Sequence, residues 1–249
     1  MALILCVETS SKNCSVSISR DGVVIYTIEE IKDSFLHGRK LHVFCKDLLS
    51  KCGLNLSEID AYALSIGPGS YTGLRIGTST VKGFSFVFKK PIIAIPTLSS
   101  MAFSRSSMKD VLLCPIIDSR KGEVYAAIYD NNFKCILSSH PHVLSPTSFS
   151  KYLEKNKILF FGTGVGKIME YISNKNAIFE DNFFPSSKYL ATLAELKYDK
   201  NEFAEINSLE PLYLKDFITN SSKNLLYLHL LIKLLFIMFE EKGNCFNAF

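Results

Sequence analysis

The sequence lacks the features that would assign its 249 residues to a class at sight. Its 28 Lys and Arg against 24 Asp and Glu leave a net charge of +4, too small an excess to indicate a nucleic-acid-binding protein. Seven cysteines form no C-x-x-C pair, so neither a zinc ribbon nor a disulfide framework is indicated, and buried reduced thiols are expected. No basic stretch precedes the apolar start, so we expect no export signal and a cytoplasmic location.

The chain has no long apolar run either. The strongest one, residues 225–239, has 15 residues and contains His229 and Lys233, whereas a membrane-spanning helix needs about 20. We therefore expect no membrane association. A hydrophobic content of 47% with 21% charged residues is ordinary for a globular protein with a sizeable core.

Hydrophobic periodicity predicts two successive series of strands and helices. In the first series we expect strands at residues 2–7, 14–18, 23–28, 61–66 and 92–95, with helices at about 41–52, 72–88 and 97–104. In the second we expect strands at 111–117, 124–129, 135–137 and 158–161, a helix starting at Ser145-Pro146 and a helix over 187–198.

Two copies of βββαβα predict an α/β protein with mixed sheets, the two-lobed actin-like and sugar-kinase (ribonuclease H-like) architecture. We place an N-terminal lobe at residues 1–104, a C-terminal lobe at 105–218 and an apolar tail at 219–249. For the tail, a helix packed on the second lobe, a partner or membrane-surface contact, and a frayed end all remain open. Fold similarity alone does not assign function.

Two segments are typical of anion binding. Glu8, Thr9 and Ser10 follow the first strand, where hydroxyls and backbone amides suit a phosphate. Gly67, Gly69 and Ser70 form a turn between a strand and a helix whose N-terminus favours negative charge. A polar hairpin is the alternative for the first segment. The segment 162–167 only superficially resembles a Walker A loop and is interpreted as a helix-entry turn.

A third segment begins at Asp118, which ends the first strand of the second series as Glu8 ends that of the first. A carboxylate there would hold Mg²⁺ against phosphates in a kinase-like cleft. The alternative is a hairpin turn in which Asp118 pairs with Arg120 or Lys121.

Gly73, Gly77, Thr80 and Phe84 recur at helical spacing. Interior glycines cost a helix about 1 kcal/mol each relative to Ala, so another backbone is expected close by. Packing on the helix's own sheet and a helix-on-helix subunit contact are both open.

Together, residues 8–10, 67–77 and 118–125 resemble the TsaB family of the glycoprotease-like superfamily. The similarity extends from Ala2 to about Phe217. Glu8 departs from the family's aspartate by one methylene group, which weakens the case for nucleotide hydrolysis.

The resemblance implies a role in N6-threonylcarbamoylation of tRNA adenosine. The TsaB family is the non-catalytic paralogue of the transferase TsaD, which carries a metal on a His-x-x-x-His motif. Laid onto this chain, those histidines fall at Thr97 and Met101, and neither residue replaces an imidazole. The resemblance therefore implies no catalytic residue, no metal and no cofactor.

The chain's own histidines agree with that expectation. His37 and His42 lie about 140° apart around a helix and cannot share a metal. His140 and His142 can share one side of a strand, but no third ligand accompanies them. No Gly-x-Ser-x-Gly elbow indicates a hydrolase.

The family's helix pairing implies a heterodimer with TsaD, joined by the ATPase TsaE, with a homodimer when the chain is alone. Contact with tRNA would come only through the complex. The partner-binding residues implied on this chain are Leu41, Phe44, Leu48, Gly73, Gly77, Thr80 and Phe84.

The main rival is an autonomous small-molecule kinase or ATPase that uses a cleft between Glu8 and Asp118. Under the first hypothesis that cleft is vestigial, with its phosphate-binding residues reduced to Glu8, Thr9, Ser10, Gly67, Gly69, Ser70 and Asp118. Direct tRNA binding, which would depend steeply on salt, is a weaker third option.

Overall fold

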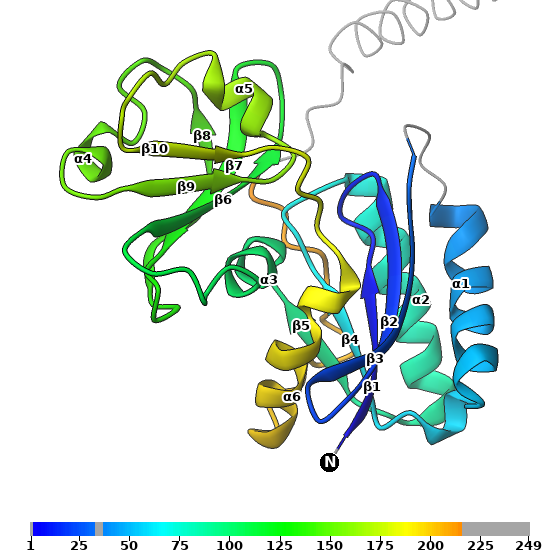
Figure 1. The fold of residues 1–249 in the computed structure, drawn as a ribbon. Helices are drawn as coiled ribbons and strands as arrows, with labels where there is room; N and C mark the ends of the chain where they lie inside the picture. The colour runs from blue at the N-terminus through cyan, green and yellow to red at the C-terminus, as the bar shows by residue number, and fades with distance from the viewer. Residues whose placement is uncertain (1, 33–36, 216–249) are drawn as a thin grey trace, which may run out of the picture. The chain divides into compact units, whose positions relative to one another are not determined.

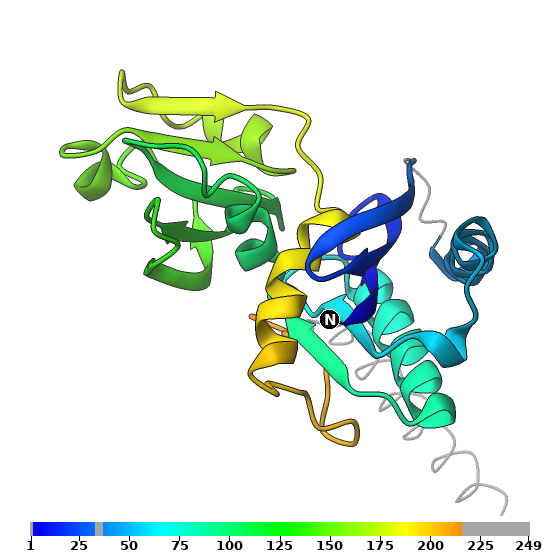
Figure 2. The same ribbon diagram turned by 60° about the horizontal axis from the view of Figure 1, so that its bottom comes forward.

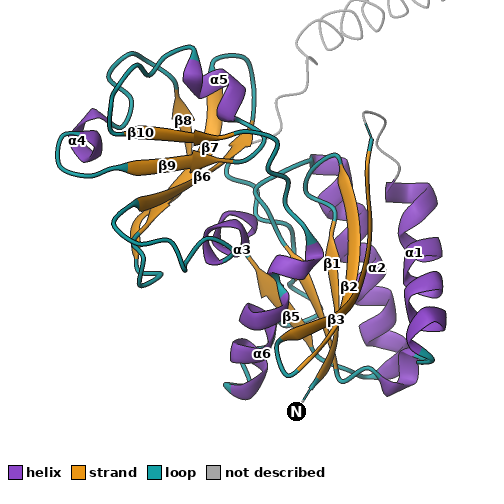
Figure 3. Cartoon of the chain, viewed as in Figure 1, coloured by secondary structure: helices purple, strands orange, loops and turns teal. Residues whose placement is uncertain are grey.

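The computed structural model describes residues 2–32 and 37–215, in which strands and helices alternate in two series (Figures 1 and 3). The first series contains β1 (Leu3–Glu8), β2 (Asn13–Arg20), β3 (Val23–Ile31), α1 (His37–Cys52), a short 3₁₀ turn η1 (Leu56–Glu58), β4 (Ala61–Ser65), α2 (Tyr71–Phe88), β5 (Ile92–Ile95) and α3 (Thr97–Phe103). The second contains β6 (Leu112–Asp118), β7 (Glu123–Tyr129), β8 (Cys135–Val143), α4 (Ser150–Leu153), β9 (Ile158–Phe161), α5 (Val165–Met169), β10 (Ala177–Glu180), η2 (Ser187–Tyr189) and α6 (Ala191–Asp199).

The two series build sheets of the same topology. The strand order is β3-β2-β1-β4-β5 in the first sheet and β8-β7-β6-β9-β10 in the second. In each, the first three strands are antiparallel neighbours and the next two add in parallel. The predicted α/β class with two mixed sheets and a repeated βββαβα order is therefore confirmed.

Local signals explain several element boundaries. Asp21 and Gly22 both have positive φ and form the two-residue β2–β3 turn. Gly53, with φ +66°, follows α1 at its C-terminus. Ser70 caps α2, since its Oγ accepts a hydrogen bond from the Gly73 amide at 3.2 Å.

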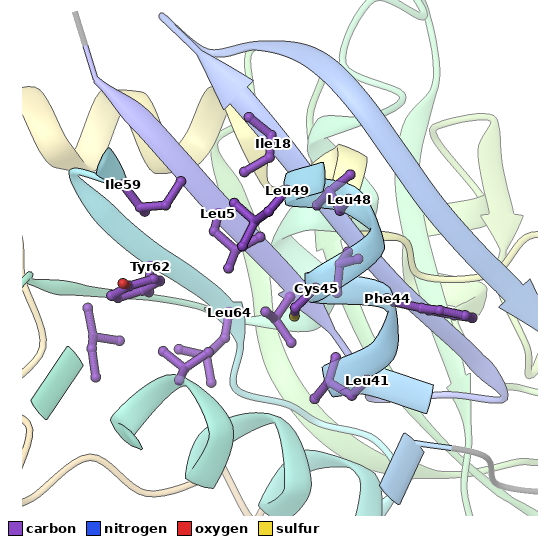
Figure 4. Close-up of a cluster of buried hydrophobic side chains, with 14 of the residues drawn as sticks. Leu5, Ile18, Leu41, Phe44, Cys45, Leu48, Leu49, Ile59, Tyr62 and Leu64 are labelled. Atoms are coloured by element: carbon purple, nitrogen blue, oxygen red, sulfur yellow. The ribbon is translucent and has the colours of Figure 1, made fainter. Parts of the chain in front are cut away.

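The core lies on both faces of each sheet. Along β1, Leu3, Leu5 and Val7 pack toward α1 and α2. Ile4 and Cys6 belong to the cluster on the opposite face. Because both faces are covered, β1 reads as a continuous apolar run rather than an alternating one. Figure 4 shows α1 directing apolar side chains onto this sheet, among them Leu41, Phe44, Cys45, Leu48 and Leu49.

The last helix of each series packs on the other series' sheet. Leu98, Met101 and Ala102 of α3 cluster with residues of β6 and β7. Leu193 and Ala194 of α6, with Leu190 just before it, cluster with β1, β4 and β5, on the face opposite α1 and α2 (Figure 2). The predicted lobes, 1–104 and 105–218, did not include this exchange, because pairing between distant helices and sheets leaves no local signal. The tail at 219–249 lies outside the described residues.

Helix α4 has only four residues and begins five residues after Ser145, where the sequence predicted a helix to start. It begins at Ser150, after a polar turn in which the Ser145 amide donates to Ser148 Oγ at 2.9 Å. Phe149 has φ +59°, a left-handed conformation that a continuous helix does not tolerate. The sequence analysis also missed β10 and ended β8 six residues early. Among the described residues, no helix is long and apolar enough to cross a membrane.

A carboxylate fixes the segment that brings α6 to the first sheet. Glu29 of β3 accepts hydrogen bonds from Ser186 Oγ at 2.5 Å, Lys188 Nζ at 2.9 Å and Asn13 Nδ2 at 3.2 Å. Ser187 Oγ adds a 2.6 Å hydrogen bond to Ser15 Oγ of β2. Burial alone would raise the pKa of Glu29, but these hydrogen bonds outweigh it and lower the pKa.

Replacing Glu29 tests this attachment. A folded-state pKa below the unfolded value gives stability that is present above the unfolded pKa of about 4.3 and lost as pH falls through the folded pKa. We expect Glu29→Gln to lower the free energy of unfolding by about 1–2 kcal/mol at neutral pH. The difference from wild type should shrink in acid, as measured by urea denaturation across pH.

Glu30→Gln is the matched control. Glu30 is half-buried and pairs with the exposed amines of Lys32 and Lys40, and ion pairs with such exposed partners contribute little. Equal losses in the two variants would contradict the role assigned to Glu29.

Candidate functional site

The three predicted segments meet at one cavity of about 780 Å³. Ser10 comes from the turn after β1, Gly69 and Ser70 from the turn before α2, and Asp118 from the end of β6. Because β1 and β6 are the central strands of their sheets, their carboxyl ends bring these turns together. The remaining lining includes basic Lys12, Lys32 and Arg120 and aromatic Tyr125, Phe183 and Phe184.

Close backbone contact holds the first two turns. The Ser70 amide donates to the Ser10 carbonyl at 2.6 Å. A Cβ at Gly69 would lie 2.4 Å from that same carbonyl oxygen, so only glycine fits there. Gly67 does not line the cavity. Its amide donates to Thr97 Oγ1 at 3.1 Å, and the Thr97 amide donates to its carbonyl at 2.8 Å.

Glu8 is fully buried and does not line the cavity. Its Oε1 accepts a hydrogen bond from the Ser10 amide at 2.6 Å. Burial raises the pKa of Glu8, against the opposing effect of hydrogen bonds with Ser10. This carboxyl hydrogen-bonds within the turn after β1 and does not line the cavity.

Asp118 reaches the cavity but is already paired. Its carboxylate lies 2.5 Å from Lys167 Nζ, which also donates to the Ser119 and Arg120 carbonyls. Lys167 lies in α5, and the sequence analysis, which offered Arg120 or Lys121 as the partner, did not name it. Residues 162–164 form the turn after β9 and α5 begins at Val165, so the interpretation of residues 162–167 as a helix entry is confirmed.

The small-residue stripe of α2 faces this chain rather than a partner. A Cβ at Gly73 would lie 2.1 Å from the Thr9 carbonyl oxygen, and one at Gly77 would lie 2.4 Å from Thr9 Oγ1. Thr80 is buried, and half-buried Phe84 packs against Tyr62 with ring centroids 5.7 Å apart. Packing on the helix's own sheet, one of the two alternatives, is what these contacts show.

The predicted contact residues of α1 also face inward. Leu41, Phe44 and Leu48 lie in the core between α1 and the sheet. Their spacing of three and four marks the inward face of an amphipathic helix, and the sequence analysis mistook that face for a binding face.

The exposed face of α2 is a different stripe. It consists of Thr72, Arg75, Ser79, Gly83 and Phe86. Phe86 is 67% exposed, and a Cβ at Gly83 would meet no atom within 4 Å. Val87, 66% exposed, and Val43 on α1, 47% exposed, add apolar surface. The same helical period, started one residue earlier at Thr72, would have found this face.

Comparison with known proteins assigns the chain to a family. Residues 33–217 match the family model described as TsaD, tRNA N6-adenosine threonylcarbamoyltransferase. The chain belongs to this family, and it is itself an α/β protein with two mixed five-stranded sheets.

Within the family, the chain is similar to the proteins named tRNA threonylcarbamoyladenosine biosynthesis protein TsaB. It is 27% identical to that of Haemophilus influenzae over 228 residues, which cover 87% of this chain and 94% of the relative. It is 31% identical to that of Buchnera aphidicola subsp. Baizongia pistaciae, over 86% and 98% of the two chains. A crystal structure from Pseudomonas aeruginosa, described as similar to peptidase YeaZ, superposes with a TM-score of 0.77 at 26% identity and covers 86% of this chain and 100% of that one. The recognition of a TsaB-like chain is confirmed.

The residues at the transferase's predicted metal positions do not fit a metal. Thr97 and Met101 are fully buried. Thr97 Oγ1 already accepts the Gly67 amide, and Met101 packs in the core with α3. No group of three or more His, Cys, Asp or Glu side chains suited to a metal occurs in residues 2–32 and 37–215.

Two glycine substitutions on α2 test which face of the helix is turned inward and which outward. We expect Gly83→Ala to raise the free energy of unfolding by about 1 kcal/mol, because alanine is the better helix former and its methyl group meets nothing. Gly77→Ala should lower it by about 1–3 kcal/mol, because its methyl group overlaps Thr9. Urea denaturation measures both.

Adding Thr9→Ala to Gly77→Ala should restore part of the loss by removing the opposing hydroxyl. Equal stabilisation by both alanines would mean that Gly77 does not approach Thr9 as described.

Proposed function

We propose that this chain is a non-catalytic subunit required for N6-threonylcarbamoyladenosine modification of tRNA. The observation that carries the proposal is its similarity, over nearly the whole length of the relatives, to proteins named TsaB. Its partner would be the TsaD transferase, with the ATPase TsaE joining the pair and a homodimer forming when the chain is alone. It would contact tRNA only through the complex, in the cytoplasm.

The cleft chemistry supports a non-catalytic role. Glu8 is buried away from the cavity and Asp118 is neutralised by Lys167. At the positions of the transferase's predicted metal ligands, Thr97 and Met101 offer no imidazole. The phosphate-binding residues of the cleft are, in this proposal, vestigial.

The contact with the transferase would use the exposed face of α2 and the adjoining face of α1. Phe86, Val87 and Val43 are large apolar side chains left exposed there. Gly83 has open space above its Cα, which lets a partner helix approach closely. A face of two helices suits an interface of standard size, about 1,600 Å² in total. Held there, the chain would orient its partner's active site.

A charged substitution at Gly83 tests this contact. We expect Gly83→Arg to fold normally, because no atom lies within 4 Å of the new Cβ. It should abolish co-elution with the TsaD partner in size-exclusion chromatography, because a long cation would be forced into an apolar interface. Gly77→Arg is unsuitable for this purpose, since the side chain would overlap Thr9.

Gly166→Arg is the matched control. Gly166 is also exposed with no atom within 4 Å of its added Cβ, and its helix, α5, belongs to the second series of elements. Normal complex formation by Gly83→Arg would reject the proposed face, and failure of the wild-type chain to capture any TsaD-type partner would reject the proposed function.

The rival kinase or ATPase activity makes the opposite prediction. If the cleft is vestigial, purified protein should turn over no ATP above a no-protein blank, and Asp118→Ala should leave that rate unchanged. A coupled assay of ADP release measures both. Turnover that falls on Asp118→Ala would favour the rival.

A further inference from the structure

Two histidines face each other on β8, the edge strand of the second sheet. His140 and His142 are separated by one residue, so their side chains lie on the same side of the strand. His140 Nε2 and His142 Nδ1 are 3.3 Å apart. The two ring planes are nearly perpendicular at 89°, with centroids separated by 5.5 Å.

The 3.3 Å distance between the two nitrogens matches the distance between two ligand atoms on a tetrahedral metal ion. Imidazole nitrogens bind Zn²⁺ at about 2.0–2.1 Å, and two such nitrogens at a tetrahedral angle lie about 3.3 Å apart. An ion between these rings would therefore need little movement of either histidine.

The outer nitrogen of each ring already has a partner. His140 Nδ1 lies 3.0 Å from the Ser138 carbonyl, and His142 Nε2 lies 2.9 Å from Ser148 Oγ. Ser148 Oγ is itself held by the Ser145 amide at 2.9 Å. With Nδ1–H of His140 donating to the carbonyl and Nε2–H of His142 donating to the hydroxyl, each inner nitrogen keeps a lone pair, and the two nitrogens lie 3.3 Å apart. Such outer contacts orient histidine ligands and raise their basicity in metal sites.

We propose that His140 and His142 form a two-imidazole chelate for a divalent transition-metal ion, with water in the remaining positions. Imidazole donors suit Ni²⁺, Cu²⁺ and Zn²⁺ rather than Mg²⁺ or Ca²⁺. Since no third His, Cys, Asp or Glu completes the set among the described residues, binding is exchangeable rather than structural. The sequence analysis dismissed this pair for want of a third ligand. Spacing alone could not show that the inner nitrogens converge.

Isothermal titration of the untagged full-length chain with NiCl₂, in a non-coordinating buffer, tests the site. We expect one Ni²⁺ per chain at micromolar to sub-millimolar affinity. His140→Gln and His142→Gln should each weaken binding about tenfold or more. Ser148→Ala should weaken it less, because it removes only an outer contact.

His42→Gln and Cys135→Ser are the controls. His42 is an exposed histidine on α1, and Cys135 is an exposed thiol at the start of β8. Both variants should bind Ni²⁺ as wild type does. Circular dichroism checks that the histidine variants remain folded. In a folded protein, the NMR shifts of both His140 and His142 should change on adding Zn²⁺.

Absence of heat at millimolar Ni²⁺ would overturn the proposal, as would binding that survives both histidine substitutions. Zn²⁺-induced shifts confined to other residues would overturn it as well. In those cases the two rings form a hydrogen-bonded pair and nothing more.

Discussion

The contact between Thr9 and the glycines of α2 constrains much of the first half of the molecule. The turn after β1 approaches α2 so closely that Gly73 and Gly77 have no room for a Cβ. This contact sets how α2 is rotated about its axis, and hence which side chains face the sheet and which face outward. It also brings Ser10 against Gly69 and Ser70, so the same approach forms one wall of the cavity.

The exchange of α3 and α6 joins the two sheets through apolar contacts rather than through a linker alone. Each sheet needs helices on both faces because its central strands are apolar on both sides. The two series supply only one such layer each. The second layer comes from the other series, and the hydrogen bonds of Glu29 with Ser186 and Lys188 fix where that crossing takes place.

The carboxylates at the ends of β1 and β6 are both engaged within the chain. Glu8 accepts a hydrogen bond in the turn after β1, and Asp118 pairs with Lys167. What the fold leaves available is surface: the outer stripe of α2 around Gly83 and Phe86, next to Val43 of α1.

From the sequence alone, the strands, most helices, the mixed α/β class and the family could be recognised. Their signals are local: Asp21-Gly22 for a hairpin, Ser70 for a helix cap, and a three-four spacing in α1. The tertiary structure alone decided that Leu41, Phe44 and Leu48 face inward, that Asp118 pairs with Lys167, and that His140 and His142 converge. A side chain's orientation and partners depend on segments distant in sequence, and helical spacing defines a face without saying which way that face is turned.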